Sequence, residues 1–484
     1  MTTNQAEFDA VVVGSGPNGL AAAVTLARAG HSVVVYEAKE TIGGGTRSAE
    51  LTLPGFTHDV CSAIHALGVS SAFFSELPLA DHGLEWIHPE IPLAHPFDDG
   101  TAAALHRSVS ETARTLSEPG STLGEDGRRY QAFMEPLVND WKKILADFMG
   151  PMRIPHHPIS ATRFGLRALR PAASLARGVF KGQKAQAFIA GLAGHAILPL
   201  EATASAASVL ILGTVGHSTG WPLVKGGSQQ IANALASYLQ SLGGEIVTGT
   251  LITSLSQLPE SKAVLLDTTP RQMSEIAGDQ LPAGYLKRLS RYRYGPGVFK
   301  VDWALDGPIP WEAEACSKAG TVHVGGTLEE IAASEREVWA GKHPERPYVL
   351  VTQQSLFDDS RAPEGKHTCW AYCHVPNGST ENMRDIIADQ IERFAPGFRD
   401  LILAEHCRNT VQMESYNPNY IGGDIIGGVQ DLRQQFTRPL PQLNPYATPL
   451  KGLYLCSSST PPGGGVHGMC GYHAAKAVLR GPLR

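Results

Sequence analysis

The chain has 484 residues, of which 43% are hydrophobic and 18% are charged, and its formal net charge is −6. This composition is that of a globular protein, and the length is enough for a large core divided between two domains. The mildly acidic balance offers no general attraction to nucleic acid, so we expect no nucleic-acid partner.

The sequence indicates neither export nor insertion into a membrane. Residues 1–7 include an acid and no basic residue, unlike a secretory signal. No apolar run reaches the roughly 18 residues that a membrane-spanning helix needs. We therefore expect a cytoplasmic protein whose seven scattered cysteines are reduced.

The first predicted elements form a β-α-β unit. Residues 8–13 (FDAVVV) are an apolar run typical of a buried parallel strand, and residues 20–29 (LAAAVTLARA) predict a helix that Gly30 caps. Residues 32–36 (SVVVY) predict a second strand that ends at Glu37. The unit spans about 30 residues, as this motif requires.

The turn between the first strand and the helix, residues 14–19, reads GSGPNG. Gly14 permits the tight turn, Gly16 lets the backbone approach a pyrophosphate, and Gly19 lets the helix pack closely on the strand. The free N–H groups at the helix N-terminus attract phosphates. Glu37 is placed to accept hydrogen bonds from ribose hydroxyls and would repel a 2′-phosphate, which favours FAD or NAD over NADP.

A second glycine cluster follows at residues 43–48 (GGGTRS). It predicts another close approach of backbone to ligand, with Arg47 near a phosphate. Residues 90 to 220 then mix helical patterns with breaks at proline and glycine, with no internal repeat.

One stretch of this middle region is basic and free of acids. No Asp or Glu occurs from residue 148 to residue 200, and Arg163, Arg167 and Arg170 share one face of a predicted helix that Pro171 ends. The apolar partners expected on this stretch are Phe164, Leu166, Leu169, Leu175 and Phe180. Such a stretch is typical of contact with an anionic lipid surface. The alternative is a solvated basic face, or attraction to an acidic substrate or a partner subunit.

Downstream, residues 229–247 predict a helix and a strand, and residues 262–266 (KAVLL) a strand that runs into Asp267. Residues 297–305 and 348–357 predict further strands, and residues 366–375 (KHTCWAYCHV) are expected to pair with the latter. Cys369, Cys373 and His374 have the residue types of metal ligands, but structural zinc sites need a second cluster. We expect no metal, because the alternation of Cys369 and Cys373 fits one face of a strand.

The C-terminal region returns to α/β character. Residues 452–456 (GLYLC) predict a strand, residues 457–468 (SSSTPPGGGVHG) a glycine-rich loop, and a helix begins near Gly468. The N-terminus of this helix is expected to face the pyrimidine edge of a flavin, where its dipole would favour the anionic reduced ring.

The two ends of the chain together resemble the large flavoprotein group that includes phytoene desaturases, carotenoid isomerases and amine oxidases. Residues 11–48 are similar to the FAD-binding signature of the group, residues 226–255 to its adenine-contacting segment, and residues 453–475 to its closing motif. Residues 294–311 (YGPGVFKVDWALDGPIPW) resemble the phytoene desaturase-related branch more than the amine oxidases. The matching segments cover about a third of the chain.

This resemblance implies FAD as cofactor and a set of residues that bind it: Gly14, Ser15, Gly16, Gly19, Glu37, Ala38, Gly44, Gly45, Thr46, Arg47, Ile252, Ser457, Ser458, Gly465, Val466 and Met469. Two features depart from the group. Only residues 256–261 (SQLPES) stand where a β-meander is usual, which predicts a trimmed FAD domain. Ser457 replaces the glycine that usually opens the closing motif, which predicts an altered pyrophosphate contact.

The implied fold is α/β, with a Rossmann-type FAD-binding domain and an interleaved substrate domain of mixed sheet and helices. The FAD-binding domain is expected to use residues 1–90, 222–290 and 440–484. The substrate domain would use residues 91–221 and 291–439, with a candidate lid at 149–200 over the substrate entrance.

A flavin accepts a hydride at N5, and a nearby base helps where a proton must also leave. His467 is the first candidate because it lies in the flavin-contacting loop, and a purely packing or capping role is its equal alternative. His65 is the second candidate, with a structural role as its alternative. Trp370, Tyr372 and His374 share one face of a predicted strand and are candidates to line the substrate cavity, although buried aromatics often belong to the core.

The leading hypothesis is an FAD-dependent dehydrogenase or desaturase of a lipophilic, isoprenoid-like small molecule. The alternatives are an amine oxidase and a redox-neutral flavoprotein similar to carotenoid isomerases. Because one glycine-rich fingerprint is present and FAD takes it, electrons are expected to leave to oxygen, a quinone or a protein rather than to arrive from NADPH. The sequence contains no Walker motif, which argues against nucleotide-triphosphatase chemistry, and we do not expect residues 213–218 (GTVGHS) to form the nucleophile elbow of a hydrolase.

Overall fold

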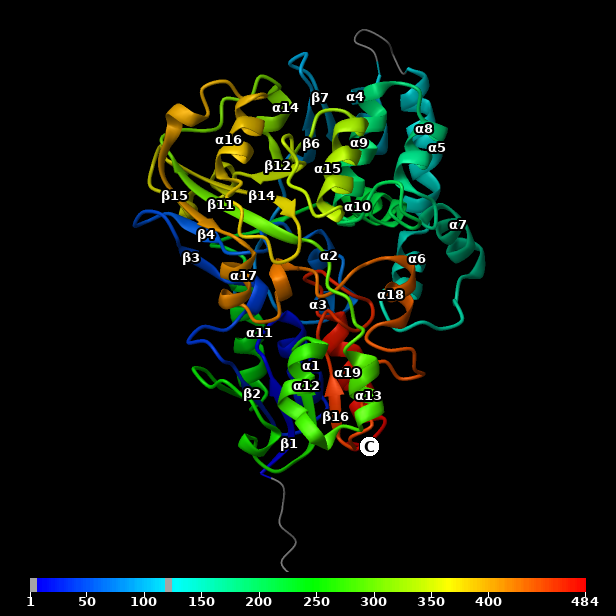
Figure 1. Ribbon diagram of the computed structural model, residues 1–484, viewed down its shortest axis with the longest axis vertical. Helices are drawn as coiled ribbons and strands as arrows, with labels where there is room; N and C mark the ends of the chain where they lie inside the picture. Colours follow the sequence, from blue (N-terminus) through cyan, green and yellow to red (C-terminus); the bar gives the residue numbers. More distant parts are fainter. Residues whose placement is uncertain (1–6, 118–123) are drawn as a thin grey trace, which may run out of the picture.

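The computed structural model describes residues 7–117 and 124–484. The first six residues, on which part of the expectation about export rests, lie outside this range. A five-stranded sheet occupies the lower half of the molecule in Figure 1, and a seven-stranded sheet occupies the upper half. No described helix has the length and apolar character that a membrane crossing requires.

The five-stranded sheet is parallel throughout and is buried on both faces. Its strands, in spatial order, are β16 (Leu453–Leu455), β10 (Ser261–Leu266), β1 (Phe8–Val13), β2 (Val33–Tyr36) and β9 (Glu245–Val247). One face packs against α1 (Pro17–Arg28), α11 (Gln229–Ser241) and α19 (Met469–Leu479). The other packs against α12 (Pro270–Ala277) and α13 (Ala283–Leu289). This double burial explains the continuous apolar runs of β1 and β10.

The β-α-β unit is confirmed in detail. Pro17 occupies the first turn of α1, where a missing N–H costs nothing, and alanines let the helix lie close to the sheet. Gly30 takes a φ of +88° after the helix, and its N–H donates to the carbonyl of Ala27. This is the expected glycine cap.

The connection from β9 to β10 is short, as expected, but it differs in one respect. The resemblance implies that a strand of the adenine-contacting segment carries Ile252, whereas β9 ends at Val247 and Ile252 lies in the following loop. Backbone hydrogen bonds from Gly249 to Lys39 and from Thr250 to Glu37 draw this loop against the end of β2. The loop therefore reaches the cavity without continuing as a strand.

The seven-stranded sheet is mixed. Its order is β15 (Ile402–Arg408), β11 (Gly297–Leu305), β14 (His367–Val375), β13 (Val349–Thr352), β12 (Ala319–Val324), β6 (Ile91–Pro96) and β7 (Ala102–Leu105). Only β12 and β6 are parallel neighbours. The expected pairing of the strands around residues 350 and 371 is confirmed, because β13 and β14 run antiparallel. The α/β fold class, with its Rossmann-type and mixed sheets, is likewise confirmed.

Alternation along β14 places its side chains on two faces. Cys369, Ala371 and Cys373 pack into an apolar cluster with α16 (Arg384–Glu392), as expected for one buried strand face. Trp370 and Tyr372 belong to the opposite cluster, which faces helices α5 (Glu125–Asn139), α7 (Pro158–Ala168), α8 (Ala172–Val179), α9 (Gln183–Gly194) and α10 (Ala206–Ser218). Helix α15 (Leu328–Trp339) packs beside α9.

Shorter elements join these layers. They are β3 (Ser48–Glu50), β4 (Thr57–Asp59), α2 (Ala66–Val69), α3 (Ala72–Ser75), β5 (Trp86–Ile87), α4 (Val109–Thr115), α6 (Trp141–Phe148), β8 (Leu223–Val224), α14 (Glu314–Ser317), α17 (Thr410–Tyr416) and α18 (Leu432–Thr437), with short 3-10 turns between them.

Candidate active site

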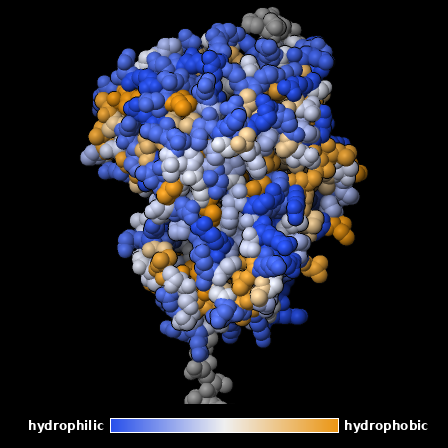
Figure 2. All heavy atoms as spheres, viewed as in Figure 1, coloured by the Kyte–Doolittle hydropathy of each residue, from blue (hydrophilic) through white to orange (hydrophobic). Residues whose placement is uncertain are grey.

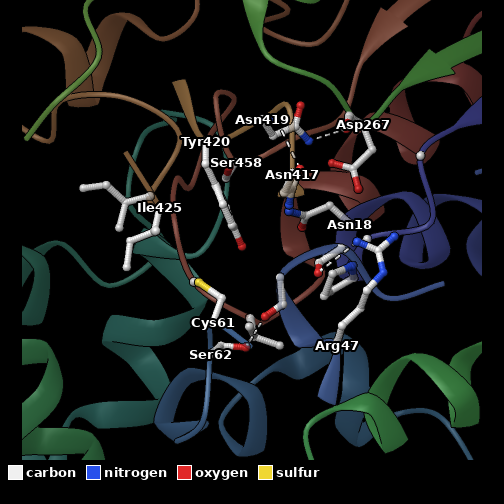
Figure 3. A pocket seen from close by; sticks show the side chains of 18 of the residues that line it. Asn18, Arg47, Cys61, Ser62, Asp267, Asn417, Asn419, Tyr420, Ile425 and Ser458 are labelled. Atoms are coloured by element: carbon white, nitrogen blue, oxygen red, sulfur yellow. Dashed lines mark hydrogen bonds between the residues drawn. The ribbon is translucent and has the colours of Figure 1, made fainter. Parts of the chain in front are cut away.

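A cavity of about 420 Å³ begins at the carboxyl ends of β1, β2 and β10 and continues to one face of the seven-stranded sheet. The end of a parallel sheet is where ligands bind in doubly wound folds, because the strands stop there and loops diverge. Figure 3 shows this cavity between the segment around Cys61, the loop around Tyr420 and the turn at Asp267.

The dinucleotide end of the cavity is built from close backbone approaches. Gly14 has a φ of +100°, and a Cβ on Gly19 would stand 2.0 Å from the carbonyl oxygen of Gly14. A Cβ on Gly44 would stand 3.1 Å from the Cα of Gly16. The two glycine clusters therefore pack against each other, and the N-terminus of α1 opens between them.

Glu37 directly follows β2, and four donors hold its carboxylate. The N–H groups of Ser15 and Lys39 donate to its carboxylate at 3.0 and 2.9 Å, and the Ser15 hydroxyl donates as well. Arg47 donates from Nη2 at 2.9 Å and also reaches the carbonyl of Thr41 at 2.7 Å. Arg47 thus orients Glu37, while its expected phosphate contact stays a prediction.

Asp267 lies at the same end of the cavity. Its Oδ2 accepts the N–H of Gly19, at the start of α1, at 2.9 Å, and its carbonyl accepts from Asn419 at 2.9 Å (Figure 3). Burial raises the pKa of Asp267 to about 7, and the nearby charge of Glu37 adds to the shift, although the N–H of Gly19 opposes it. A carboxyl group that stays protonated near pH 7 carries no negative charge that would repel an anionic pyrophosphate at this end of the cavity.

The far end of the cavity is largely apolar. Trp370 and Tyr372 line it as expected, with Thr321, Leu350, Leu212, Trp221 and Ile425. The indole N–H of Trp370 donates to the carbonyl of Cys61 at 3.0 Å. His374 lies outside the lining, because its Nδ1 interacts with the carboxylate of buried Glu335 at 2.8 Å. The sequence correctly predicted that these three side chains share one face of the strand. His374, however, lies outside the cavity lining.

The two candidate bases differ in position. His65 lines the cavity, its Nε2 lies 2.8 Å from the hydroxyl of Ser228, and burial lowers its pKa to about 4. His467 lies outside the lining. Its Nδ1 accepts the N–H of Met469, the first of α19, at 3.0 Å, and burial lowers its pKa to about 4. The geometry of His467 is therefore that of a helix cap, and its role as a base stays a prediction.

Several lining residues carried no sequence signal. Cys61, His195, Trp221 and Tyr420 come from loops or helix ends far apart in the sequence. Behind Trp370, the buried ammonium of Lys300 lies 5.5 Å from the indole ring centre and pairs with Asp302. Only the alternation of β11 in the sequence hinted that these two charged side chains share a face.

The comparisons with known proteins agree with this arrangement. Residues 18–479 match the family described as flavin containing amine oxidoreductase. The chain belongs to the flavin-containing amine oxidoreductase family. Among its relatives are the pyridine nucleotide-disulfide oxidoreductase domain-containing protein 2 of Rattus norvegicus, at 27% identity over 98% of this chain and 94% of the relative, and the 4,4′-diapophytoene desaturase of Staphylococcus haemolyticus, at 23% over 94% and 95%.

Two solved structures share the fold. An oxidoreductase from Methanosarcina mazei superimposes with a TM-score of 0.65 at 16% identity, covering 97% of this chain and 99% of the other. A putrescine oxidase bound to putrescine superimposes with a TM-score of 0.61 at 18% identity, covering 98% and 99%. As a member of this family, the protein is an FAD-dependent oxidoreductase that acts on a small molecule.

The residues present fit FAD. The buried Oδ1 of Asn18, on the first turn of α1, lines the cavity and has no hydrogen-bond partner in the described parts of the chain. Most of the expected FAD-binding residues line the cavity: Gly14, Gly16, Glu37, Ala38, Gly44, Gly45, Arg47, Ile252, Ser458, Gly465 and Val466. This end of the cavity therefore combines a helix N-terminus, a ribose-binding acid and glycines.

Five expected FAD-binding residues lie outside the lining: Ser15, Gly19, Thr46, Ser457 and Met469. They lie behind the residues that line the dinucleotide end of the cavity and support them. Ser15 holds Glu37, Gly19 donates to Asp267, and the hydroxyl of Thr46 donates to the carbonyl of Gly43 at 2.8 Å. Ser457 and Met469 stand at the two ends of the loop that carries Gly465 and Val466 into the cavity.

Replacing His467 with alanine tests its two roles. We expect the variant to keep FAD but to lose about 1 kcal/mol of stability, because the first N–H of α19 loses its acceptor. His467→Asn offers an acceptor again and should restore the Tm. Flavin reduction that is slow in both variants would identify a chemical role for the imidazole, whereas reduction restored with the Tm would leave His467 as a cap.

Proposed function

We propose that the protein dehydrogenates a neutral, lipophilic small molecule by hydride transfer to FAD. One observation carries this proposal: a single cavity joins the dinucleotide cradle to an apolar pocket at the seven-stranded sheet. Four Asp, Glu, Lys or Arg side chains line this cavity within residues 7–117 and 124–484, namely Glu37, Lys39, Arg47 and Asp267, and all belong to the dinucleotide end.

The distribution of charge favours an uncharged substrate. A protonated amine buried against this sheet would need a carboxylate to offset its desolvation. The buried carboxylates of Asp302 on β11 and Glu335 on α15 lie outside the cavity lining, and Asp302 pairs with Lys300 while Glu335 interacts with His374. The lipophilic lining and the likeness to a desaturase of the family therefore support oxidation of a C–H bond.

The residues of the chain bind, orient and exclude water. Glu37 is placed to bind the adenosine ribose, and the N-terminus of α1 the pyrophosphate. Bound FAD supplies a hydride acceptor at flavin N5. The hydrogen bond from the indole N–H of Trp370 to the carbonyl of Cys61 fixes the indole ring. The fixed ring holds the substrate in one orientation. His65 lines the cavity as a neutral imidazole and stays the candidate to accept a proton, although its burial makes it a weak base.

Anaerobic stopped-flow spectroscopy tests this function. We expect isoprenoid alcohols or hydrocarbons to bleach the flavin absorbance, primary amines to leave it unchanged, and NADPH to give no saturable rapid reduction. Rapid reduction by amines alone would favour the amine-oxidase alternative. Conversion of a substrate only after the flavin has been reduced, without net oxidation, would favour the redox-neutral alternative. Saturable reduction by NADPH would contradict the single-dinucleotide interpretation.

We also propose that the surface around residues 152–169 contacts an anionic lipid membrane. Met152, Ile154, Ile159 and Leu166 are 75%, 90%, 76% and 69% exposed. Figure 2 shows apolar atoms gathered at the right edge of the molecule, where Figure 1 places α7. Arg153 and Arg170 accompany them in this acid-free stretch, and each basic residue near such a surface adds about 1 kcal/mol. Of the other two arginines predicted here, Arg163 pairs with Asp140 and Arg167 packs over the ring of Phe133.

The apolar partners expected from the sequence need correction. Phe164, Leu175 and Phe180 are buried in the helical core, because the inward face of α7 and α8 packs against α10. Leu166 and Leu169 are exposed as the membrane hypothesis requires. Helix α9 is buried along most of its length, so the candidate lid at 149–200 is in part a core element.

Co-sedimentation with phosphatidylserine vesicles tests the membrane contact. We expect the wild type to pellet with the vesicles at physiological salt and Ile154→Asp/Ile159→Asp to remain in the supernatant, because each acid opposes insertion. Val411→Asp on α17 is a matched control, because Val411 is also exposed but lies outside this surface. Wild-type protein that stays in the supernatant would contradict the proposal.

A further inference from the structure

The substrate end of the cavity contains polar atoms that the apolar lining does not explain. We define the sheet-side pocket as the part of the cavity lined by His195, Leu212, Trp221, Thr321, Leu350, Trp370 and Tyr372. The hydroxyl of Thr321 is buried and has no hydrogen-bond partner within the described ranges. Burying a hydroxyl without a hydrogen-bond partner costs free energy of folding. A buried, unpaired hydroxyl in the wall of a cavity therefore indicates that a bound ligand supplies the missing hydrogen bond.

His195 provides a second polar atom in the same pocket. It ends α9 and lies with its Nε2 at 2.8 Å from the Nε2 of His323, a fully buried residue of β12. Trp221 packs edge-on against the His195 ring, at 5.7 Å between ring centres. The other ring nitrogen of His195, Nδ1, takes no part in this pair, and His195 lines the cavity.

The strand register places these atoms on one face. Thr321 and His323 are two residues apart on β12, so both side chains point to the same side of the sheet. His323 pairs with Leu350 across β13, and Leu350 pairs with Tyr372 of β14. Tyr372 therefore belongs to the same face of the sheet, and it also lines the cavity. Thr321, His195 and Tyr372 thus bring polar groups to the part of the cavity beside this face.

The chemistry of these groups selects a neutral ligand. Burial lowers the pKa of His195 to about 3 and that of His323 well below its usual value. Both imidazoles are therefore neutral, and the hydrogen bond between their Nε2 atoms joins two uncharged rings. A neutral imidazole donates from one nitrogen and accepts at the other, and the Thr321 and Tyr372 hydroxyls can do either. Such a set complements a hydroxyl or carbonyl oxygen, and it offers no charge to a carboxylate or an ammonium group.

We propose that the sheet-side pocket is a binding subsite for a hydroxyl or carbonyl group at one end of an otherwise apolar substrate, held by His195, Thr321 and Tyr372. His323 acts as a positioning residue, because it touches the substrate group only through His195. This inference rests on the proposed function in one respect, namely that the cavity is where the substrate binds. It narrows the substrate class from lipophilic molecules in general to lipophilic alcohols and ketones.

Binding of two isosteric probes tests the subsite. Headspace partitioning onto the purified holoprotein measures affinity for 1-octanol and for n-nonane, which differ by one terminal group. We expect Thr321→Val, which keeps the shape of the side chain, to weaken 1-octanol about fivefold to tenfold, as the loss of one neutral hydrogen bond implies, and to leave n-nonane unchanged. His195→Leu should have the same selective effect.

A matched control removes only apolar contact. Leu212→Ala enlarges the same pocket, so it should weaken both probes by a similar factor. Equal losses of the two probes in Thr321→Val and His195→Leu, or affinity for 1-octanol that both variants leave unchanged, would overturn the subsite. The flavin spectrum of the same samples reports separately on the proposed function, because protein without bound flavin would contradict that function while the probe affinities would still decide the subsite.

Discussion

Gly16→Val protein is expected to fold and to be colourless. The backbone of Gly16 has φ −65° and ψ 170°, a conformation that valine adopts without strain. Its side chain, however, would begin 2.7 Å from Oδ2 of Asp267 and fill the space through which a pyrophosphate approaches α1. Valine therefore keeps an allowed backbone conformation at this position, but it displaces the carboxyl of Asp267 and blocks the cofactor.

The expected magnitude follows from the bonds that are lost. A hydrogen bond to a charged group contributes about 1.5–3 kcal/mol, so losing two between the backbone and the phosphates lowers FAD affinity by at least about 100-fold. Absorbance of the purified variant near the flavin bands measures this directly, and quenching of flavin fluorescence on titration gives the Kd. Far-UV circular dichroism on the same sample verifies that the fold is intact.

Gly30→Ala is the matched control for this prediction. Gly30 has a φ of +88° and no atom near its Cβ position, and it lies at the far end of α1. Alanine there strains the backbone by about 1 kcal/mol, so the variant should lose stability but keep its colour. A yellow Gly16→Val protein, or a colourless Gly30→Ala protein, would refute the assignment of the cradle.

The contribution of the sequence to this site depends on how local each feature is. Gly14, Gly16 and Glu37 belong to one contiguous β-α-β unit, so spacing alone placed them. Gly465 and Val466 were placed in the loop by the resemblance of residues 453–475 to the closing motif of the family. The orientation of His467 within that loop was not, because it depends on Met469 closing back onto the imidazole through a conformation at Gly468 with φ +69°.

Residues brought together by the tertiary fold left no pattern to find. Thr321, His195 and Tyr420 come from a strand, a helix end and a loop that are separated by more than 90 residues. Alternation along β14 correctly grouped Trp370, Tyr372 and His374 on one face of the strand. It does not predict which side chains on that face border a cavity. The position of Glu335 on α15 decides that His374 belongs to the protein interior.

Asp267→Asn is expected to be more stable than the wild type at neutral and alkaline pH. The carboxyl group has a pKa of about 7 in the folded chain because of burial, against an unperturbed value near 3.8. Between these values the folded state binds one more proton than the unfolded state. The stability contributed by this group is therefore fully present below about pH 4 and is lost as the pH rises through 7.

Asparagine removes this dependence while it keeps an oxygen that accepts the N–H of Gly19. The variant should therefore gain stability relative to the wild type as the pH rises from 4 to 7, by on the order of 4 kcal/mol for the full shift. Urea unfolding of both proteins across this range, at one fixed concentration of free FAD, measures the difference and keeps ligand linkage equal.

Asp9→Asn provides a control of opposite sign. Asp9, on β1 of the same sheet, pairs with Lys262, and this hydrogen bond holds the pKa of its carboxyl below the usual value. Its contribution is therefore present above about pH 4 and is lost as the pH falls, and it is small because the pair is partly exposed. If the stability difference for Asp267→Asn were flat from pH 4 to pH 8, the carboxyl would be ionised throughout, and a pyrophosphate beside it would face a fixed negative charge.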